Sequence, residues 1–280
     1  MKFNLLADSG ATKTSWSLCL DGQIIQQFDS KGISPIYQTQ EEIEEYIYET
    51  VFPEFKDKTI DAVYFYGSGC IPEKVPMVTS AIYKTFPLET IHVYSDLIAA
   101  VHALCGYQSG IACILGTGSN SCEWDGEKIV KQISPLGFIL GDEGSGADLG
   151  KRLVNNALKE MLPKDLKEAF LEEYQLTPSI IIDKVYRHPF PSRFLASLSP
   201  FLLKNIENPV VRNIVMTSFS DFFEKNVMHY NYQNNKVNFV GSIAYYYADI
   251  LKQAAVDKGI EIGIIYKSPM DGLIEFYKDK

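Results

Sequence analysis

The sequence is short of basic residues and of long apolar runs. Its 26 lysines and arginines stand against 35 acidic residues, which gives a net charge of −9. Phosphate backbones are bound through basic patches, so this balance excludes nucleic acid as the main partner. No apolar run approaches the ~20 residues of a membrane span, and the start lacks the apolar core of a signal peptide. We therefore expect a cytoplasmic protein without a membrane partner.

Cysteine is sparse, and its spacing shows no pairs. Five cysteines are an odd number, and no CxxC pair occurs among them. This argues against a disulfide framework and against a zinc site. The four histidines are also scattered without ligand spacing, so we interpret them as structural. The cysteines, which we interpret as reduced thiols, are Cys19, Cys70, Cys105, Cys113 and Cys122.

A Walker A loop is absent, because GxxxxGK[ST] occurs nowhere in the chain. Instead, a turn of small residues at 8–14 joins the strand-like runs 3–7 and 15–20. Such a turn can present backbone N–H groups and hydroxyls to a phosphate, although an ordinary tight turn has the same composition. Asp8, at the end of a strand, could hold Mg²⁺ through water. The candidate phosphate ligands are Gly10, Thr12, Lys13 and Thr14.

The pattern of the N-terminus returns in the middle of the chain. Strand, small-residue turn, strand, Asp-Gly turn and strand follow one another over 3–28 and again over 111–133. Two copies of one supersecondary unit predict a duplicated fold. The second turn would then face the first, and the two would clamp a triphosphate. Its candidate ligands are Gly116, Thr117, Gly118 and Ser119.

The 280 residues are enough for two domains. The first half continues with alternating helices and strands, and the second half is mostly helical. Apolar spacing predicts helices at 41–55, 77–86, 97–105, 151–162, 166–174, 180–186, 193–206, 210–230 and 270–277, and strands at 62–66, 91–94, 237–240 and 262–266.

Three further features carry polar groups that could transfer a proton or bind a ligand. Asp96 follows a strand and opens a helix, where it could accept a proton from an attacking hydroxyl or simply cap the helix. Asp142 and Glu143 stand between glycines, which favours a loop that exposes both carboxylates and a helix from Ser145. Such a loop suits sugar hydroxyls, and a solvated acidic turn is the alternative. Gly241-Ser242, after a strand, can receive a nucleotide.

Taken together, these motifs resemble those of the superfamily that unites sugar kinases, heat-shock chaperones and actin. The turns at 8–14 and 115–119 look like its two phosphate motifs, Ser95-Asp96 like its connecting motif and 240–244 like its adenosine motif. The stretch 140–146 is similar to the signature loop of N-acetylglucosamine kinases and of the BadF/BadG/BcrA/BcrD-type ATPase group.

The resemblance implies an α/β protein with two ribonuclease-H-like (actin-like ATPase) lobes, an interlobe cleft for ATP and substrate, and a helix-rich second lobe. We expect the lobes at 1–108 and 109–269, with the C-terminal helix 270–280 packing back on the first. It also implies Asp96 as general base and Asp8 near Mg²⁺. The expected sugar ligands are Ser34, Ser68, Asp96, Thr117, Asp142 and Glu143.

The sequence departs from the family's usual motifs at two places, both in segments that we expect to bind the sugar. Ser34 stands where the family usually has asparagine, and Pro135-Leu136-Gly137 replaces a glycine pair. Both concern the identity of the sugar more than the use of ATP. A homodimer formed through the second lobe is also compatible with the resemblance.

The function we expect is transfer of the γ-phosphoryl group of ATP, with Mg²⁺, to a hydroxyl of an amino sugar such as N-acetylglucosamine, at its 6-position. Two alternatives use the same fold. One is an ATPase activator of a radical dehydratase, for which Cys105 and Cys122, or Cys113, would have to hold an iron–sulfur cluster. The other is a nucleotide-binding regulator without catalysis.

Overall fold

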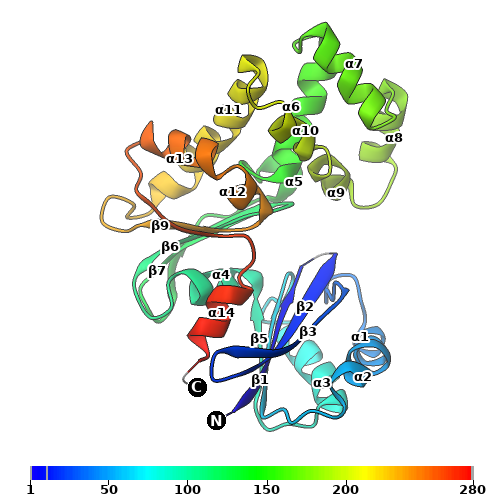
Figure 1. The fold of residues 1–280 in the computed structure, drawn as a ribbon, viewed down its shortest axis with the longest axis vertical. Helices are drawn as coiled ribbons and strands as arrows, with labels where there is room; N and C mark the ends of the chain where they lie inside the picture. The colour runs from blue at the N-terminus through cyan, green and yellow to red at the C-terminus, as the bar shows by residue number, and fades with distance from the viewer. Residues whose placement is uncertain (1, 11, 279–280) are drawn as a thin grey trace. The chain divides into compact units, whose positions relative to one another are not determined.

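The computed structural model describes residues 2–10 and 12–278 (Figure 1). Ala11, in the first glycine-rich turn, lies outside these residues, as does the end of the helix predicted for 270–280. The chain divides into two compact units, and each is described by itself. Unit 1 comprises Met1–Gly106 with Ser268–Lys280, and unit 2 comprises Tyr107–Lys267.

Unit 1 is built on a five-stranded sheet in the order β3-β2-β1-β4-β5. The strands are β1 (Phe3–Ser9), β2 (Lys13–Leu20), β3 (Gln23–Lys31), β4 (Ala62–Gly67) and β5 (Ile91–Ser95). β1, β2 and β3 are antiparallel, and β4 and β5 run parallel to β1. Asp21 and Gly22, both with positive φ, form the predicted hairpin turn between β2 and β3.

Helices cover both faces of this sheet because β1 is apolar on both sides. Leu5 belongs to one buried cluster, which α1 and α3 complete, and Leu6 to another beneath α4 and α14. The helices are α1 (Gln40–Tyr46), a π-helical turn (Ile47–Val51), α2 (Phe52–Phe55), α3 (Val75–Thr85), α4 (Asp96–Leu104) and α14 (Met270–Phe276). The helix predicted for 41–55 is therefore confirmed as one helical segment, since the residues at both joins keep right-handed helical φ and ψ. The π-helical turn lies just before Pro53, which lacks the N–H that continues the regular bonding.

Unit 2 repeats the sheet, which confirms the predicted duplication. Its order is β10-β9-β6-β7-β8, so β8-β7-β6-β9-β10 matches β3-β2-β1-β4-β5 strand for strand. β6, β7 and β8 are antiparallel, and β9 and β10 run parallel to β6. The strands are β6 (Gly110–Leu115), β7 (Ser119–Trp124), β8 (Ile129–Gln132), β9 (Val237–Val240) and β10 (Ile262–Tyr266).

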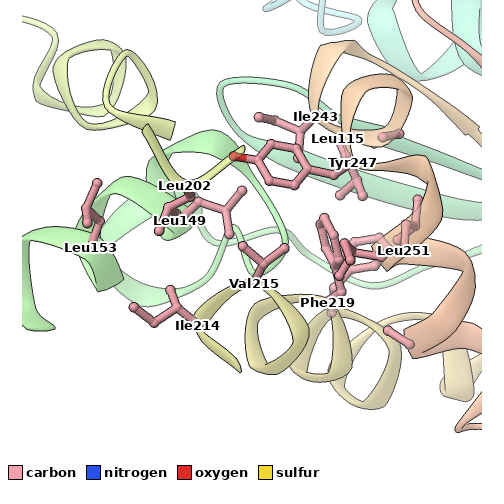
Figure 2. Close-up of a cluster of buried hydrophobic side chains, with 14 of the residues drawn as sticks. Leu115, Leu149, Leu153, Leu202, Ile214, Val215, Phe219, Ile243, Tyr247 and Leu251 are labelled. Atoms are coloured by element: carbon pink, nitrogen blue, oxygen red, sulfur yellow. The ribbon is translucent and has the colours of Figure 1, made fainter. Parts of the chain in front are cut away.

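A large apolar core joins the helices of unit 2 to one face of its sheet (Figure 2). Leu115 from β6, Leu149 from α6 and Phe219 from α11 are fully buried in it. Burial of a side chain of this size stabilises the fold by roughly 1.5–3 kcal/mol. The helices are α5 (Gly137–Leu140), α6 (Gly146–Leu158), α7 (Lys164–Glu173), α8 (Pro178–Tyr186), α9 (Pro191–Ala196), α10 (Ser199–Lys204), α11 (Pro209–Lys225), α12 (Ser242–Tyr246) and α13 (Ala248–Val256).

Two of the predicted helices end earlier than their apolar pattern does. The segment 193–206 splits into α9 and α10 because Pro200 starts the second helix and cannot continue the first. The segment 210–230 becomes α11 followed by the 3₁₀ turn Val227–His229. Among the helices in the described ranges, none is long and apolar enough to cross a membrane.

Candidate active site

The carboxyl ends of β1, β4 and β5 bring two acidic residues of unit 1 together. Asp8 is the second-to-last residue of β1, and Asp96 follows β5 as the first residue of α4. Parallel strands end at the same edge of a sheet, which is where open α/β sheets bind ligands. Burial, and then the charge of Asp96, raise the pKa of Asp8 to about 7, while Lys13 acts in the opposite direction. A carboxylate pair of this kind suits a hydrated Mg²⁺, which favours one or two carboxylates.

Asp96 does not serve as the cap of α4. That role belongs to Ser95, whose hydroxyl accepts from the Ile98 N–H at 3.3 Å. The Asp96 carboxylate accepts instead from the Leu97 N–H at 2.8 Å and from the Ser68 hydroxyl. Burial raises its pKa above the usual range for aspartate. Asp96 is therefore oriented by two donors and tuned toward proton uptake, as a general base requires.

Two further predicted sugar ligands lie next to Asp96. The Ser68 N–H donates to the Ser9 carbonyl at 2.9 Å, which holds the turn after β4 against β1. Ser34 is buried, and its hydroxyl reaches the Ser68 carbonyl at 3.5 Å. Its own N–H donates to Gln38 Oε1 at 2.8 Å. Ser34, Ser68 and Asp96 thus form one group, and Gln38 is a supporting residue that the sequence analysis missed.

In the first glycine-rich turn, the Gly10 N–H donates to the Lys13 carbonyl at 2.9 Å. Thr12 and Lys13 are exposed there. The side-chain role predicted for Thr14 is wrong, because this residue is fully buried. Its hydroxyl lies 2.7 Å from Ser9 Oγ and donates to the Lys31 carbonyl at 3.2 Å. It fixes the strands rather than meeting a phosphate.

Lys13 is already paired across the sheet. Its Nζ lies 2.8 Å from Asp29 Oδ2, and Ser15 Oγ donates to Asp29 Oδ1 at 2.8 Å. These donors lower the pKa of Asp29. The pair opens onto a cavity of about 310 Å³ in unit 1, at the same end of the sheet as Asp8. The cavity is lined by Lys13, Ser15, Trp16, Gln27, Phe28, Asp29, Ser268, Met270 and Asp271.

In unit 2 the second glycine-rich turn follows β6 and is anchored by the start of α6. The N–H groups of Gly146 and Ala147 donate to the carbonyls of Gly116 and Thr117 at 2.8 and 3.0 Å. This fixes the peptide planes of the turn, while the Thr117 side chain stays exposed. The two N–H donors at the start of α6 are consumed in the process, so they are not offered to a phosphate.

Gly241 packs against this turn. Its φ is +124°, and a Cβ there would lie 2.2 Å from the Leu115 carbonyl oxygen, so only glycine fits. The Gly241 N–H donates to the Tyr266 carbonyl at 3.0 Å. Ser242 is exposed and opens α12. The ends of β6 and β9 therefore bring both candidate nucleotide segments of unit 2 side by side.

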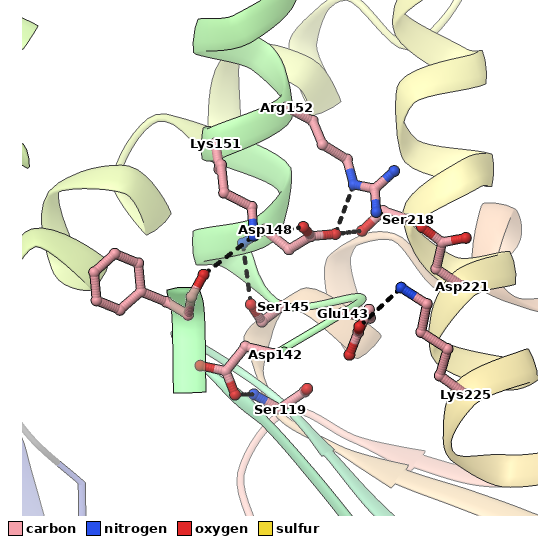
Figure 3. Close-up of polar contacts among 11 residues, drawn as sticks. Ser119, Asp142, Glu143, Ser145, Asp148, Lys151, Arg152, Ser218, Asp221 and Lys225 are labelled. Carbon is pink, nitrogen blue, oxygen red and sulfur yellow. Dashed lines mark hydrogen bonds and ion pairs between the residues drawn. The ribbon is translucent and has the colours of Figure 1, made fainter. Parts of the chain in front are cut away.

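The acidic loop differs from the prediction that it exposes both carboxylates. Asp142 is only 8% exposed. Its Oδ1 accepts from the Ser119 N–H at 3.1 Å (Figure 3). Its own N–H donates to the Pro135 carbonyl at 3.0 Å. Burial raises the pKa of its carboxyl. Glu143 is half-buried and pairs with Lys225 Nζ at 3.0 Å. Through the hydrogen bond from Ser119 to Asp142, the acidic loop is thus tied to the second glycine-rich turn.

The structure gives the iron–sulfur hypothesis little support. Cys113 and Cys122 are fully buried in unit 2, and Cys105 is partly exposed in unit 1. Within residues 2–10 and 12–278, no group of three or more histidine, cysteine and acidic side chains is arranged to hold a metal ion. The hypothesis requires Cys105 together with Cys122 or Cys113, and both of these possible partners of Cys105 are fully buried.

Searches against known proteins return structural matches. No protein-family model matches the sequence, and a search of curated proteins returns no match. A provisionally named N-acetylglucosamine kinase from Porphyromonas gingivalis is 44% identical, with a TM-score of 0.96 over 100% of this chain and 99% of that one.

More distant matches share the fold. A provisionally named N-acetylglucosamine kinase from Chromobacterium violaceum is 17% identical, with a TM-score of 0.74 over 99% of both chains. A ROK-family glucokinase from Streptomyces griseus, solved with glucose and AMPPNP, is 14% identical, with a TM-score of 0.60 over 98% of this chain and 97% of that one. With 44% identity to the first of these proteins along its whole length, the chain belongs to the N-acetylglucosamine kinase-like family of the sugar kinase–heat-shock chaperone–actin superfamily.

Proposed function

We propose that this protein is a sugar kinase that transfers the γ-phosphoryl group of ATP to the 6-hydroxyl of an amino sugar such as N-acetylglucosamine. The observation that carries the proposal is the arrangement around Asp96. Its carboxylate is buried, is oriented by the Leu97 N–H and the Ser68 hydroxyl, and lies close enough to Asp8 to raise the pKa of that group. The names of the two N-acetylglucosamine kinase-like relatives support the amino sugar.

In the proposed reaction, Asp96 accepts the proton of the sugar hydroxyl as that oxygen bonds to the γ-phosphorus. The bond from the γ-phosphorus to the bridging oxygen breaks, and ADP leaves with the electron pair. A carboxylate with a raised pKa takes up this proton better than an ordinary aspartate. When bound, Mg²⁺ would neutralise charge on the phosphate oxygens, and Asp8 would hold it through water.

The remaining candidate ligands divide between phosphate and sugar. In unit 1 the exposed turn would supply Gly10, Thr12 and Lys13 to the phosphates. In unit 2 the turn 116–119 would bind phosphate, with Gly241 and Ser242 along the nucleotide. The sugar would be held by Ser34, Ser68, Thr117, Asp142 and Glu143 in addition to Asp96.

The experiment is a coupled ADP-release assay with Mg-ATP against hexoses, N-acetylhexosamines and muramic acid derivatives. Asp96→Asn removes the base but keeps the volume of the side chain, and Asp249→Asn on exposed α13 is the matched control. We expect sugar-dependent ADP release that falls by roughly 10²–10⁴-fold in Asp96→Asn and is retained in Asp249→Asn. ATP binding without turnover on any sugar would refute the proposal and favour the regulator or activator.

A further inference from the structure

A buried carboxylate in unit 2, Asp148, joins the acidic loop to two helices (Figure 3). Its side chain is 3% exposed. Oδ2 accepts from Arg152 Nε and from Ser218 Oγ, both at 2.7 Å. Oδ1 lies 3.3 Å from Lys151 Nζ. The carboxylate therefore makes two sets of contacts. One, which we call the Arg152 arm, extends to α11, and the other, the Lys151 arm, extends to α5.

The Arg152 arm stays among helices. Arg152 also donates to Asp221 on α11, so this arm crosses from α6 to α11. A break in this arm would loosen the packing of the two helices, because Asp148 would be left buried with fewer donors.

The Lys151 arm reaches the loop. The ammonium group donates to the Phe138 carbonyl in α5 at 3.1 Å while it pairs with Asp148. α5 has no fully buried residue, and Leu136, Ile139 and Leu140 beside and within it are 61%, 74% and 74% exposed. Apolar packing therefore contributes little to holding this segment, and the lysine contact is one of few that tie it down.

The backbone of the segment 136–142 is strained at both of its ends. Leu136 and Asp142, at its two ends, have φ of 61° and 56°. Non-glycine residues in this region are strained by roughly 1–2 kcal/mol each. The Gly141 N–H donates to the Gly137 carbonyl at 2.8 Å, so α5 runs directly into the Asp142 backbone. A shift of α5 would be passed on to the Asp142 carboxylate.

We propose that Lys151, held in place by Asp148, is a positioning residue that fixes α5 and, through it, the Asp142 carboxylate for the acceptor sugar. The role in sugar binding rests on the proposed function. The charge of Lys151 also opposes the rise in the pKa of Asp142 that burial causes. Lys151 acts without touching the sugar.

The test compares Lys151→Met, Lys151→Arg and Asp221→Asn in the full chain. Methionine keeps most of the stem of a side chain that is 43% exposed, so folding should be preserved. We expect Lys151→Met to raise KM for the sugar on the order of tenfold, the effect of one partly screened charged hydrogen bond. KM for ATP should change little, and arginine should restore most of the sugar affinity. The melting temperature should fall only modestly, because the buried Asp148 loses one partner but keeps Arg152 and Ser218.

Asp221→Asn is the control for a purely structural effect. The substitution weakens the contact of Arg152 with α11. We therefore expect a lower melting temperature, with the KM values for sugar and for ATP both retained. Equal increases of both KM values in Lys151→Met, or no rescue by arginine, would overturn the positioning role.

Hydrogen exchange supplies a readout that needs no turnover. In Lys151→Met, the amides of Gly141 and Asp142 should exchange on the order of tenfold faster, whereas in Asp221→Asn they should not. Unchanged exchange in Lys151→Met would overturn the inference even if sugar kinetics changed. If wild-type protein shows no sugar-dependent ADP release, the proposed function fails, and exchange alone still decides whether Lys151 holds α5.

Discussion

Replacement of Asp8 by asparagine should stabilise the protein at neutral pH in the absence of Mg²⁺. The pKa of Asp8 is raised from 3.8 to about 7, first by burial and then by Asp96. Below pH 3.8 both folded and unfolded chains carry the proton. As the pH rises toward 7, the unfolded chain ionises freely and the folded chain does not. Wild-type stability is therefore lost over this window, and above about pH 7 the loss is complete. Asparagine does not ionise, so the variant does not lose stability as the pH rises.

The size of the effect follows from that difference. From 3.8 to about 7 the bound is about 4 kcal/mol, at 1.36 kcal/mol per pH unit. Asp8 is partly exposed, so solvent screening should reduce this to about 2 kcal/mol. At roughly 3 °C per kcal/mol, the variant should gain about 6 °C over wild type at pH 8.

The assay is thermal unfolding of both proteins from pH 4.5 to 8 without Mg²⁺ or nucleotide. Asp57→Asn, at an exposed turn of the same unit, is the control and should follow wild type. The advantage of Asp8→Asn should grow with pH and level off near 7. A variant that parallels wild type at every pH, or is less stable at pH 8, would show that ionisation of Asp8 does not destabilise the folded chain. The same variant should need far more Mg²⁺ for turnover.

Three other replacements test separate parts of the site. Thr14→Val should cost about 1–2 kcal/mol of stability and leave KM for ATP unchanged, as denaturant unfolding and kinetics would show; a large rise in KM would restore its phosphate role. Gly241→Ala should cost at least 3 kcal/mol, because its Cβ meets the Leu115 carbonyl at 2.2 Å; a melting temperature equal to wild type would contradict this. Asp142→Asn keeps an acceptor for Ser119 but loses the charge, so KM for the sugar should rise about tenfold or more while KM for ATP holds, and a change confined to ATP would reassign the loop.

The repeated sheet could be predicted because its signal is local. Each copy begins with an apolar run, a small-residue turn and an Asp-Gly turn, and these features alone fix three antiparallel strands. The strand ends then place Asp8 and Asp96 at one edge, as parallel strands dictate. The helix break near Pro200 was available from the same reasoning, since proline lacks the donor that continues a helix.

What could not be predicted depends on partners distant in sequence. Asp142 is buried because the Ser119 N–H, 23 residues away, satisfies its carboxylate. Asp29 meets Lys13 diagonally across β2 and β3, and only the register of the two strands reveals the pair. Asp148 offered two local signals, Lys151 three residues on and Arg152 four residues on, but its link to α11 is tertiary.

The product of the reaction shows whether this protein phosphorylates the 6-hydroxyl of an amino sugar. Incubation of the protein with Mg-ATP and N-acetylglucosamine, followed by phosphorus–proton correlation NMR, reports where the phosphoryl group goes. The account predicts one phosphate ester at the 6-position, formed together with ADP and lost in Asp96→Asn. Release of inorganic phosphate without an ester, or ester formation by Asp96→Asn at the wild-type rate, would contradict it.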